Sequence, residues 1–379
     1  DFWDHLIIDP GEIKTKSETN YKVYTPFSIS WKRKLENNYP EGFSIISKPS
    51  YLKRVETMRI KKENLIFWEK LNIIKNLNEL DWSFEGYSLC PCIPGEKAAQ
   101  IQLSKFSQKS SLQKLNSPAM VNGSIYTYAK NRDFPSIQGT SFLSAALASG
   151  TISPRVIINE IINSRIISLN ANKDRSLKST ITWEKEIIWR EFYHHALFAF
   201  PELAKGPFRS KWINFPWQNN SSYFDSWAHG FTGFPIIDAA MRQLNASGWM
   251  HNRCRMIVAS FLVKDLICDW RLGESLFMSK LVDGDIASNN GGWQWSASSG
   301  MDSKPLRIFN PYTQTKRFDP QAIYIKYWLP ELKHINNHDL ISGDISSIER
   351  RGYPCPIVDH NKQQSKFKKI YATLPISIQ

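Results

Sequence analysis

The chain has 379 residues and 42% of them are hydrophobic, which is enough for a large buried core and for two domains, or for one domain with an elaborated connection. Its formal net charge of +13 favours an anionic partner, and no apolar run approaches the roughly 20 residues that a membrane helix needs. We therefore expect a cytoplasmic protein that binds a polyanion and not a protein of the membrane.

The first part of the chain has little regular patterning. Residues 1–8, DFWDHLII, indicate a short strand before an Asp-Pro-Gly turn, and a strand at the very start predicts that an earlier segment is missing. Residues 14–130 are rich in Lys, Asn, Ser and Pro and contain only short helical candidates, such as residues 96–106. A segment of this length without strong elements is typical of a connection between domains.

From about residue 140 the hydrophobic spacing becomes helical, and alternating strand patterns are nearly absent. Ser153-Pro154 and Asp238 are predicted helix starts, and Ser247-Gly248 is a predicted helix end. The second two thirds of the chain is therefore predicted to be all-α, which makes the fold mainly α. The segments with helical spacing are residues 143–147, 153–167, 182–200, 235–244, 250–270 and 272–282.

The cysteines and histidines do not predict a metal site. Five cysteines are scattered along the chain, and the close pair Cys90 and Cys92 has no second pair at metal-ligand spacing. Lone histidines such as those at 194, 195 and 251 are more often structural residues than metal ligands. We expect free thiols and no bound metal.

One face of the helix predicted at residues 182–200 carries Glu186, Trp189, Arg190 and Tyr193 at positions i, i+3, i+4 and i+7. Such a row could line a binding surface. It could equally be the solvent face of an amphipathic helix with an i,i+4 ion pair. These residues alone leave both interpretations open.

The helix predicted at residues 250–270 begins with polar residues that a purely structural helix would not need. Asn252, Arg255 and Met256 share one face, and Arg253 lies beside them. The first turn of a helix also offers unpaired N–H groups to an anion. This segment is therefore a second candidate binding surface.

Residues 283–295, DGDIASNNGGWQW, combine aspartates, asparagines and glycines with two tryptophans. Glycine and asparagine are typical of a turn, but a surface turn rarely ends in two indoles. Phosphate-binding P-loop and dinucleotide-binding glycine motifs are absent from the sequence, and so is a nucleophile elbow. The run therefore indicates a site of a different kind.

Taken together, the sequence resembles the photolyase/cryptochrome family, and specifically the class I cyclobutane pyrimidine dimer DNA photolyases of bacteria. The matching stretches lie mostly within residues 128–332 and are long. They are EIIWREFY, FTGFPIIDAAMRQLNASGWMHNRCRMIVASFLVKDLICDWRLGE, FMSKLVDGDIASNNGGWQWSASSG, RIFNPYTQTKRFDP and WLPEL.

The resemblance implies a monomeric, light-driven enzyme that repairs double- or single-stranded DNA containing pyrimidine dimers. Its all-helical domain holds FAD, and reduced, photoexcited flavin passes an electron to a dimer flipped out of the duplex. On this basis residues 110–379 are the helical FAD- and DNA-binding domain, and residues 13–109 are an interdomain linker. Residues 1–12 are then a remnant of the last strand of an α/β antenna domain. The family's antenna pigment, a pterin (methenyltetrahydrofolate) or a deazaflavin, binds to that domain, most of which this sequence lacks.

The resemblance also assigns residues to the flavin. Arg255 and Asp283 are expected to pair beside the isoalloxazine ring, and Asn289 is expected to face its N5 atom. Hydroxyl and backbone groups near residue 140 are expected to hold the phosphates. The full set of FAD positions is Tyr128, Thr140, Ser141, Ser144, Trp183, Arg255, Asp283, Asp285 and Asn289.

A second set of positions is implied for DNA and for electron transfer. Glu186 is expected to hydrogen-bond the dimer and stabilise its added charge. The other lesion-pocket residues are Trp189, Asn252, Met256 and Trp295, and the residues near the DNA backbone are Arg132, Arg190, Arg253 and Arg307. Trp217, Trp270 and Trp293 match an electron-transfer chain to the flavin, although three core tryptophans would have the same spacing.

Two local departures from the family pattern bear on this function. Leu306 stands alone between Pro305 and Arg307, where the family has two residues, and this could shift Arg307 relative to DNA. Phe142 stands where a basic residue is common, so a charge beside the FAD phosphates is lost and FAD binding is expected to weaken modestly. The alternatives are a cryptochrome-like photoreceptor, which often has a residue other than asparagine at position 289, and a remnant that binds DNA without flavin.

Overall fold

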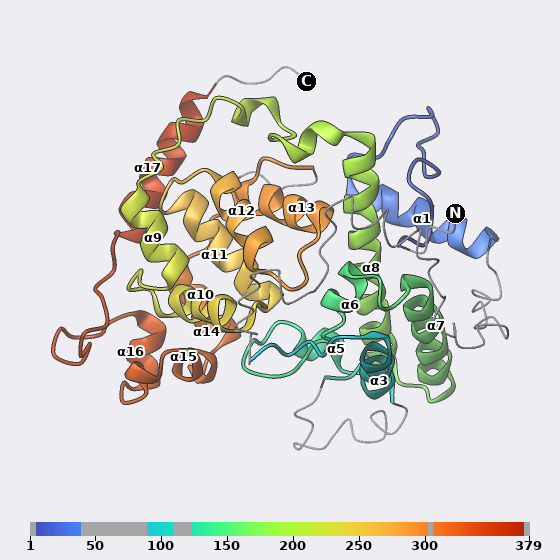
Figure 1. Cartoon of the computed structure of the whole chain (residues 1–379), viewed down its shortest axis with the longest axis horizontal. Coiled ribbons are helices and arrows are strands. Elements are labelled where there is room, and N and C mark those ends of the chain that lie inside the picture. The colour runs from blue at the N-terminus through green and yellow to red at the C-terminus, as the bar shows by residue number, and fades with distance from the viewer. Residues whose placement is uncertain (1–4, 39–88, 109–122, 302–305, 375–379) are drawn as a thin grey trace, which may run out of the picture. The chain divides into compact units, whose positions relative to one another are not determined.

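The computed structural model describes residues 5–38, 89–108, 123–301 and 306–374, all of which belong to one compact unit. Helices dominate the described residues, in agreement with the predicted mainly α fold (Figure 1). Among the described residues β pairing is confined to isolated bridges, such as the one between Lys14 and Asn20. None of the described helices is long and apolar enough to cross a membrane.

The helices fall into two groups, each with its own hydrophobic core. The first core is built around α7, α8 and the helices that pack on them, and the second around α10 and α11. The helices of the first group are α1 (Tyr24–Asn38), α3 (Glu96–Ser107), α5 (Tyr128–Asn131), α6 (Ser144–Ala148), α7 (Pro154–Asn170) and α8 (Asp174–Ala199). Those of the second are α9 (Ser221–His229), α10 (Pro235–Ser247), α11 (Asn252–Lys264), α12 (Trp270–Lys280), α13 (Ile286–Ala297), α14 (Pro311–Phe318), α15 (Ile323–Trp328), α16 (Asn337–Ser342) and α17 (His360–Thr373).

Helix α8 is the element that joins the two groups, because it packs on α7 and α1 and also contacts α13 (Figure 1). Its 26 residues bury Trp183, Ile187, Ile188 and Phe192 at spacings of one to four positions, so one side faces the first core. The adjacent row, which begins at Glu186, is left to face α11 and α13. The fold therefore places this row between the two groups of helices.

Most predicted helices are present, with shifted ends. Ser153 caps α7 by accepting a hydrogen bond from the N–H of Arg155, and α10 ends at Ser247 with Gly248, whose φ of 63° is left-handed, as its C-cap. The helix predicted at residues 250–270 instead ends at Lys264, and a new helix begins at Trp270. The run at residues 283–295 also folds mainly as a helix, α13, and not as a turn.

Asp238 does not start a helix, which corrects the prediction from the sequence. Helix α10 begins three residues earlier at Pro235, and Asp238 is fully buried inside it. Its carboxylate accepts hydrogen bonds from the N–H groups of Thr232 and Gly233 and from the Tyr353 hydroxyl, at 2.5–2.9 Å. Burial raises the pKa of Asp238 to about 6. The aspartate therefore organises the loop that precedes the helix.

The described parts of the predicted linker contribute to the first core. Helix α3 matches the short candidate at residues 96–106, whereas the 15-residue α1 was not predicted. Trp31 of α1 is fully buried and its indole N–H donates to Glu191 of α8. Both helices therefore pack against the helical domain, and the domain boundary at residue 109 stays a prediction.

Residues 5–8 form no strand, although they were expected to belong to one; residues 1–4 lie outside the described residues. The backbone N–H groups of Ile7 and Ile8 donate to the buried Glu191 carboxylate at 3.0 and 3.2 Å, and the Ile8 carbonyl is 3.0 Å from His195 Nε2. Glu191 and His195 of α8 thus make the backbone hydrogen bonds that a neighbouring strand would otherwise make. The assignment of these residues to a lost domain stays a prediction.

Candidate functional site

Two adjoining cavities, of ≈ 380 Å³ and ≈ 270 Å³, lie where α8 faces α11 and α13. Volumes of this order are typical of small-molecule sites. The residues that line both cavities are Arg132, Glu186, Arg190, Asn252, Arg255, Asp283, Asp285 and Ser288. Because the two share so much of their wall, we treat them as one elongated site with a larger and a smaller chamber.

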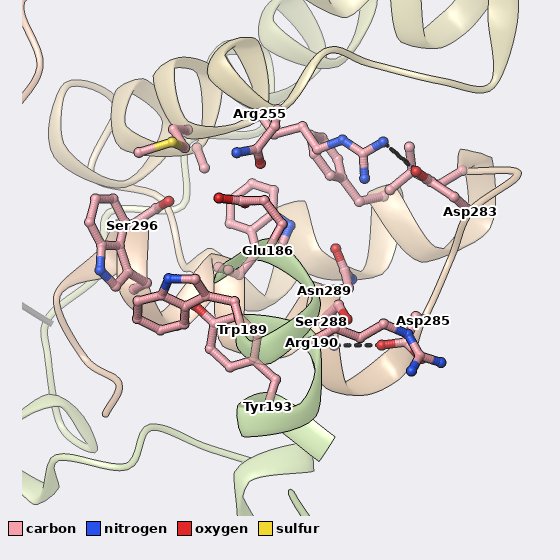
Figure 2. Close-up of a pocket in the computed structure, with 18 of the residues that line it drawn as sticks. Glu186, Trp189, Arg190, Tyr193, Arg255, Asp283, Asp285, Ser288, Asn289 and Ser296 are labelled. Atoms are coloured by element: carbon pink, nitrogen blue, oxygen red, sulfur yellow. Dashed lines mark hydrogen bonds and ion pairs between the residues drawn. The ribbon is translucent and has the colours of Figure 1, made fainter. Parts of the chain in front are cut away.

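The larger chamber brings together the residues that were predicted for the lesion. Glu186 and Trp189 enter it from α8, Asn252 and Met256 from α11, and Trp295 from α13. Figure 2 shows Glu186 between Arg255 above it and Trp189 and Tyr193 below it, with Asn289 beside Ser288 on α13. The row on α8 therefore lines a cavity between helices and is not an open solvent face. That this row binds a substrate stays a prediction.

Glu186 is the central titratable group of this chamber. Burial raises its pKa, while the adjacent Arg132, which pairs with it through Nη1, acts to lower the pKa. Nε of Arg132 is also 3.8 Å from Oδ1 of Asp133, and the same oxygen accepts a hydrogen bond from Nη2 of Arg253 at 2.7 Å. The result is a chain of alternating charges at the edge of the site, with a carboxyl group that gains a proton more readily than an ordinary glutamate.

The pair of Arg255 and Asp283 forms as predicted (Figure 2). The Nη2 atom of Arg255 donates to both carboxylate oxygens of Asp283, at 3.0 and 2.8 Å, and its Nε donates to the carbonyl of Met250 at 2.8 Å. The side chain of Asp283 is only 3% exposed. A guanidinium with three such bonds has one orientation, so it is a fixed part of the wall between the two chambers.

Asp285 caps α13, because its carboxylate accepts a hydrogen bond from the N–H of Ser288 at 2.7 Å. Its other close partner is His194, whose Nε2 is 3.2 Å from Oδ2 of Asp285. Burial acts to raise the pKa of Asp285, but His194 and Ser288 together hold it below its ordinary value. The carboxylate therefore stays charged at the edge of both chambers.

His5, His194 and Asp285 place three potential metal-ligand atoms within 4.8 Å of one another. However, Nη2 of Arg190 lies 2.9 Å from Nε2 of His5, and its Nη1 donates to the His5 carbonyl at 2.7 Å. A guanidinium in that place repels a cation and takes the lone pair that a metal would need. We therefore interpret the cluster as a hydrogen-bonded tie between α8, α13 and the residues before α1.

Asn289 projects from α13 into the larger chamber. Its Nδ2 donates to the backbone carbonyl of Glu274 at 3.0 Å, and its side-chain oxygen is turned into the chamber (Figure 2). No atom of the described residues lies within 4 Å of the position of a Cβ on Gly292, one turn further along α13, whereas a Cβ on Gly291 would meet the Tyr193 ring at 2.2 Å. Gly292 thus leaves the chamber wall open, and Gly291 allows α13 to pack closely against Tyr193 of α8.

The smaller chamber is lined by the residues that were predicted to hold the phosphates, Tyr128, Thr140, Ser141 and Ser144, together with Trp183. The Thr140 hydroxyl is buried and has no hydrogen-bond partner among the described residues, which leaves a polar atom for a ligand. Phe142 has a left-handed backbone with φ of 53°, and its ring lies 5.0 Å from that of Trp249. The position where a basic residue is common in the family is therefore occupied by Phe142, which packs against Trp249.

The predicted DNA-contact arginines all make contacts inside the protein. Arg132 and Arg253 belong to the charge chain at the site, and Arg190 is bound to His5. Arg307 lies outside both chambers, 5.9 Å from the Trp295 ring. The residues from 302 to 305 lie outside the described part of the chain, so the effect of the shortened segment before Arg307 stays a prediction.

The three predicted electron-transfer tryptophans have different surroundings. Trp293 lines the larger chamber and contacts Phe277 and Trp227, with ring centroids 5.0 and 6.1 Å apart. Trp270 is buried in the second core, and Trp217 is partly buried against it, outside both chambers. Electron transfer along these residues therefore stays a prediction.

Sequence reasoning did not assign several wall residues. Tyr193 was placed on the correct face of α8, and that helical spacing was the signal that could have included it. Trp249 precedes α11 and Ser288 lies beside a capping aspartate, so neither follows a periodic pattern. The wall residues without an earlier assignment include Tyr193, Trp249, Met250, Phe277, Leu281, Ser288 and Ser296.

Comparison with known proteins connects this geometry to a family. Residues 183–373 match the family model described as the FAD binding domain of DNA photolyase. The chain is 46% identical over 376 residues to a protein from a Synechococcus species named deoxyribodipyrimidine photo-lyase, covering 99% of this chain and 72% of that protein.

Two solved structures are also similar. A bacterial class III photolyase from Agrobacterium tumefaciens has a TM-score of 0.74 and 34% identity, covering 97% of this chain and 71% of its own. A cryptochrome from Synechocystis has a TM-score of 0.64 and 31% identity, covering 75% of this chain and 57% of its own. The elongated site fits the FAD of the matched family, because the unpartnered Thr140 hydroxyl and the open wall at Gly292 leave polar contacts and space for a ligand.

Proposed function

Because this chain belongs to the deoxyribodipyrimidine photo-lyase family, we propose that it repairs cyclobutane pyrimidine dimers in DNA with light. The observation that carries the proposal is the convergence of Glu186, Trp189 and Trp295 in a chamber that shares its wall with the flavin positions. FAD, when bound, would supply the excited electron. The protein's own residues would bind the dimer, exclude water and stabilise added charge.

The smaller chamber would hold the phosphate and sugar part of FAD, and the junction of the chambers would hold its ring. Thr140, Ser141 and Ser144 offer hydroxyl and backbone groups for the phosphates. Arg255, held by Asp283, would present a fixed positive charge to the ring. Because Nδ2 of Asn289 is committed to Glu274, its oxygen is the atom offered to the ring, and an oxygen accepts a hydrogen bond from the N5–H group of reduced flavin.

Glu186 would act on the dimer directly. A dimer that has received an electron carries negative charge on its carbonyl oxygens, and a protonated carboxyl group can donate a hydrogen bond to it. The raised pKa of Glu186 favours this protonated form. Arg132, its present partner, would remain beside the same oxygens and contribute positive charge.

The remaining lesion residues would provide shape and apolar contact. Trp189 and Trp295 offer ring faces on which flipped bases can stack, and Met256 can adapt to the dimer. Asn252 can hydrogen-bond base edges. Arg307 would contact DNA phosphates directly. Arg190 and Arg253 would do so after exchanging their internal partners His5 and Asp133, and Arg132 would add a phosphate contact while it stays beside Glu186.

Repair of a defined oligonucleotide tests the proposal. The FAD-loaded, chemically reduced protein is mixed without oxygen with an oligonucleotide that carries one thymine dimer, and it is illuminated. We expect light-dependent recovery of thymines, with single- and double-stranded substrates compared side by side, and a monomer in size-exclusion chromatography. A protein that binds FAD and responds to light without restoring thymines would favour a photoreceptor, and a protein that cannot be loaded with FAD would contradict both.

A further inference from the structure

The indole of Trp189 is stacked against a residue from a distant part of the chain. The ring of Tyr24, the first residue of α1, lies 3.7 Å from the Trp189 ring, centroid to centroid, with an angle of only 2° between the two planes. Tyr24 is 8% exposed, so its ring is almost completely enclosed. One face of Trp189 is therefore covered, while the residue still lines the larger chamber.

Tyr24 is held in this position at both of its ends. Its hydroxyl donates to the carbonyl of Lys185 at 3.1 Å, one turn before Trp189 on α8. Further along α1, Phe27 packs on Phe192 with ring centroids 5.3 Å apart, and Trp31 donates to Glu191 at 3.3 Å. Residues 24, 27 and 31 follow helical spacing, so α1 lies along α8 as a fixed support.

Two further aromatic rings of α8, those of Tyr193 and Phe192, pack beside the Trp189 indole and restrict its rotation. Tyr193 lies 5.5 Å away at 35°, and Phe192 lies 5.7 Å away at 82°. With one face against Tyr24 and its edges against these two rings, the indole has little freedom to rotate. An indole that is already held in place loses little conformational entropy when a base stacks on it.

We propose that Tyr24 is a positioning residue for the reaction: it supports the back of Trp189 and holds the indole toward the substrate chamber. This inference rests on the proposed function. Tyr24 would thus be an additional residue of the lesion-binding site. It lies 159 positions before the segment that matches the flavin-domain family, which begins at residue 183. Through α1, the segment predicted as a linker would then contribute to substrate recognition.

Binding in the dark tests the inference without photochemistry. The affinity of the FAD-loaded protein is measured for an oligonucleotide with one thymine dimer and for its undamaged counterpart, for wild type, Tyr24→Leu and Tyr24→Phe. We expect Tyr24→Leu to reduce dimer affinity about 2- to 10-fold, the range that an aromatic stacking pair is worth, with undamaged-DNA affinity and flavin absorbance unchanged. Tyr24→Phe keeps the stacked ring and is expected to restore most of the discrimination.

Phe27→Leu is the matched control, because Phe27 lies on the same helix and its ring contacts on α8 are with Phe192 and His195. It should lower thermal stability but leave the preference for the dimer intact. In a double-mutant cycle, Tyr24→Leu should have little further effect in the Trp189→Leu background, because its effect passes through Trp189.

Equal loss of discrimination in Tyr24→Leu and Phe27→Leu would overturn the inference, and so would additive effects of Tyr24→Leu and Trp189→Leu. If the wild type prefers dimer DNA and the Tyr24→Leu variant shows the same preference, the inference is overturned and the proposed function is not. A wild-type protein with no preference for the dimer would overturn the proposed function, and the inference with it.

Discussion

The two arginine–carboxylate pairs of the site differ in how firmly they are held. Arg255 makes three hydrogen bonds, two of them to an almost fully buried Asp283. Arg132 pairs with a Glu186 side chain that is 31% exposed, and Arg132 also has Asp133 nearby. The first pair is an immobile wall on the cofactor side. The second can exchange partners, which is what a group that must bind an incoming substrate needs.

Removal of Arg255 should give the largest effect, because it breaks the rigid pair. Arg255→Ala leaves the Asp283 carboxylate buried without its partner, so we expect loss of FAD and a decrease of about 3 kcal/mol in the free energy of unfolding. Flavin absorbance of the purified variant and chemical denaturation measure the two effects. Arg132→Ala is the matched control, and if both variants lost FAD equally the difference between the pairs would disappear.

Substitution of Glu186 should affect repair without affecting FAD. Glu186→Ala removes a hydrogen bond to a charged dimer, so we expect the repair yield per absorbed photon to decrease by about tenfold. Glu186→Gln keeps a hydrogen-bond donor and should lose less. An alanine variant with wild-type yield would show that the exchangeable pair has no part in the reaction.

The raised pKa of Glu186 also predicts a pH dependence. The folded protein holds the carboxyl proton more tightly than the unfolded chain, so this group's contribution to stability is present at low pH and is lost as the pH rises through its folded-state pKa. We expect repair by the wild type to decrease over the same range and repair by Glu186→Gln to change less. Parallel pH profiles for the two proteins would contradict this assignment.

Lys264 offers a smaller test on the DNA side. Burial lowers its pKa to about 7, and its Nζ donates to the Ser298 hydroxyl at 3.1 Å and to the Arg307 carbonyl. Lys264→Met should free the Arg307 segment and weaken DNA binding about 2- to 5-fold, roughly the net worth of one hydrogen bond. Affinity titrations at several salt concentrations should show little further loss when Arg307→Ala is added.

The smallest effect is expected at Phe142. Phe142→Arg restores a cation beside the predicted phosphate site and should tighten FAD binding by about 2- to 5-fold, since an exposed ion pair is worth only about 0.5–1 kcal/mol. Titration of the apoprotein with FAD measures it. The gain should decrease in high salt, and weaker binding would show that the contact of Phe142 with Trp249 matters more than the charge.

The sequence itself predicted the features that depend on neighbours along the chain. Helical spacing placed Glu186 and Trp189 on one face of α8, and Ser153 and Gly248 marked helix ends through local hydrogen bonds and backbone angles. The pair of Arg255 and Asp283 was reached only through resemblance to a family, since no local pattern joins the two residues. These predictions succeeded where the determining contacts span a few residues or where a matching motif had already brought distant ones together.

Contacts between distant segments decided the rest. Helix α1 has weak local patterning and is defined by packing on α8, and Arg190, predicted to face DNA, is bound to the residues before α1. The stack of Tyr24 on Trp189 joins residues 165 positions apart in the chain. Periodicity determines which face of a helix is apolar, because side chains recur every few residues. Which residue covers that face depends on the packing of the whole chain, and only the tertiary structure contains it.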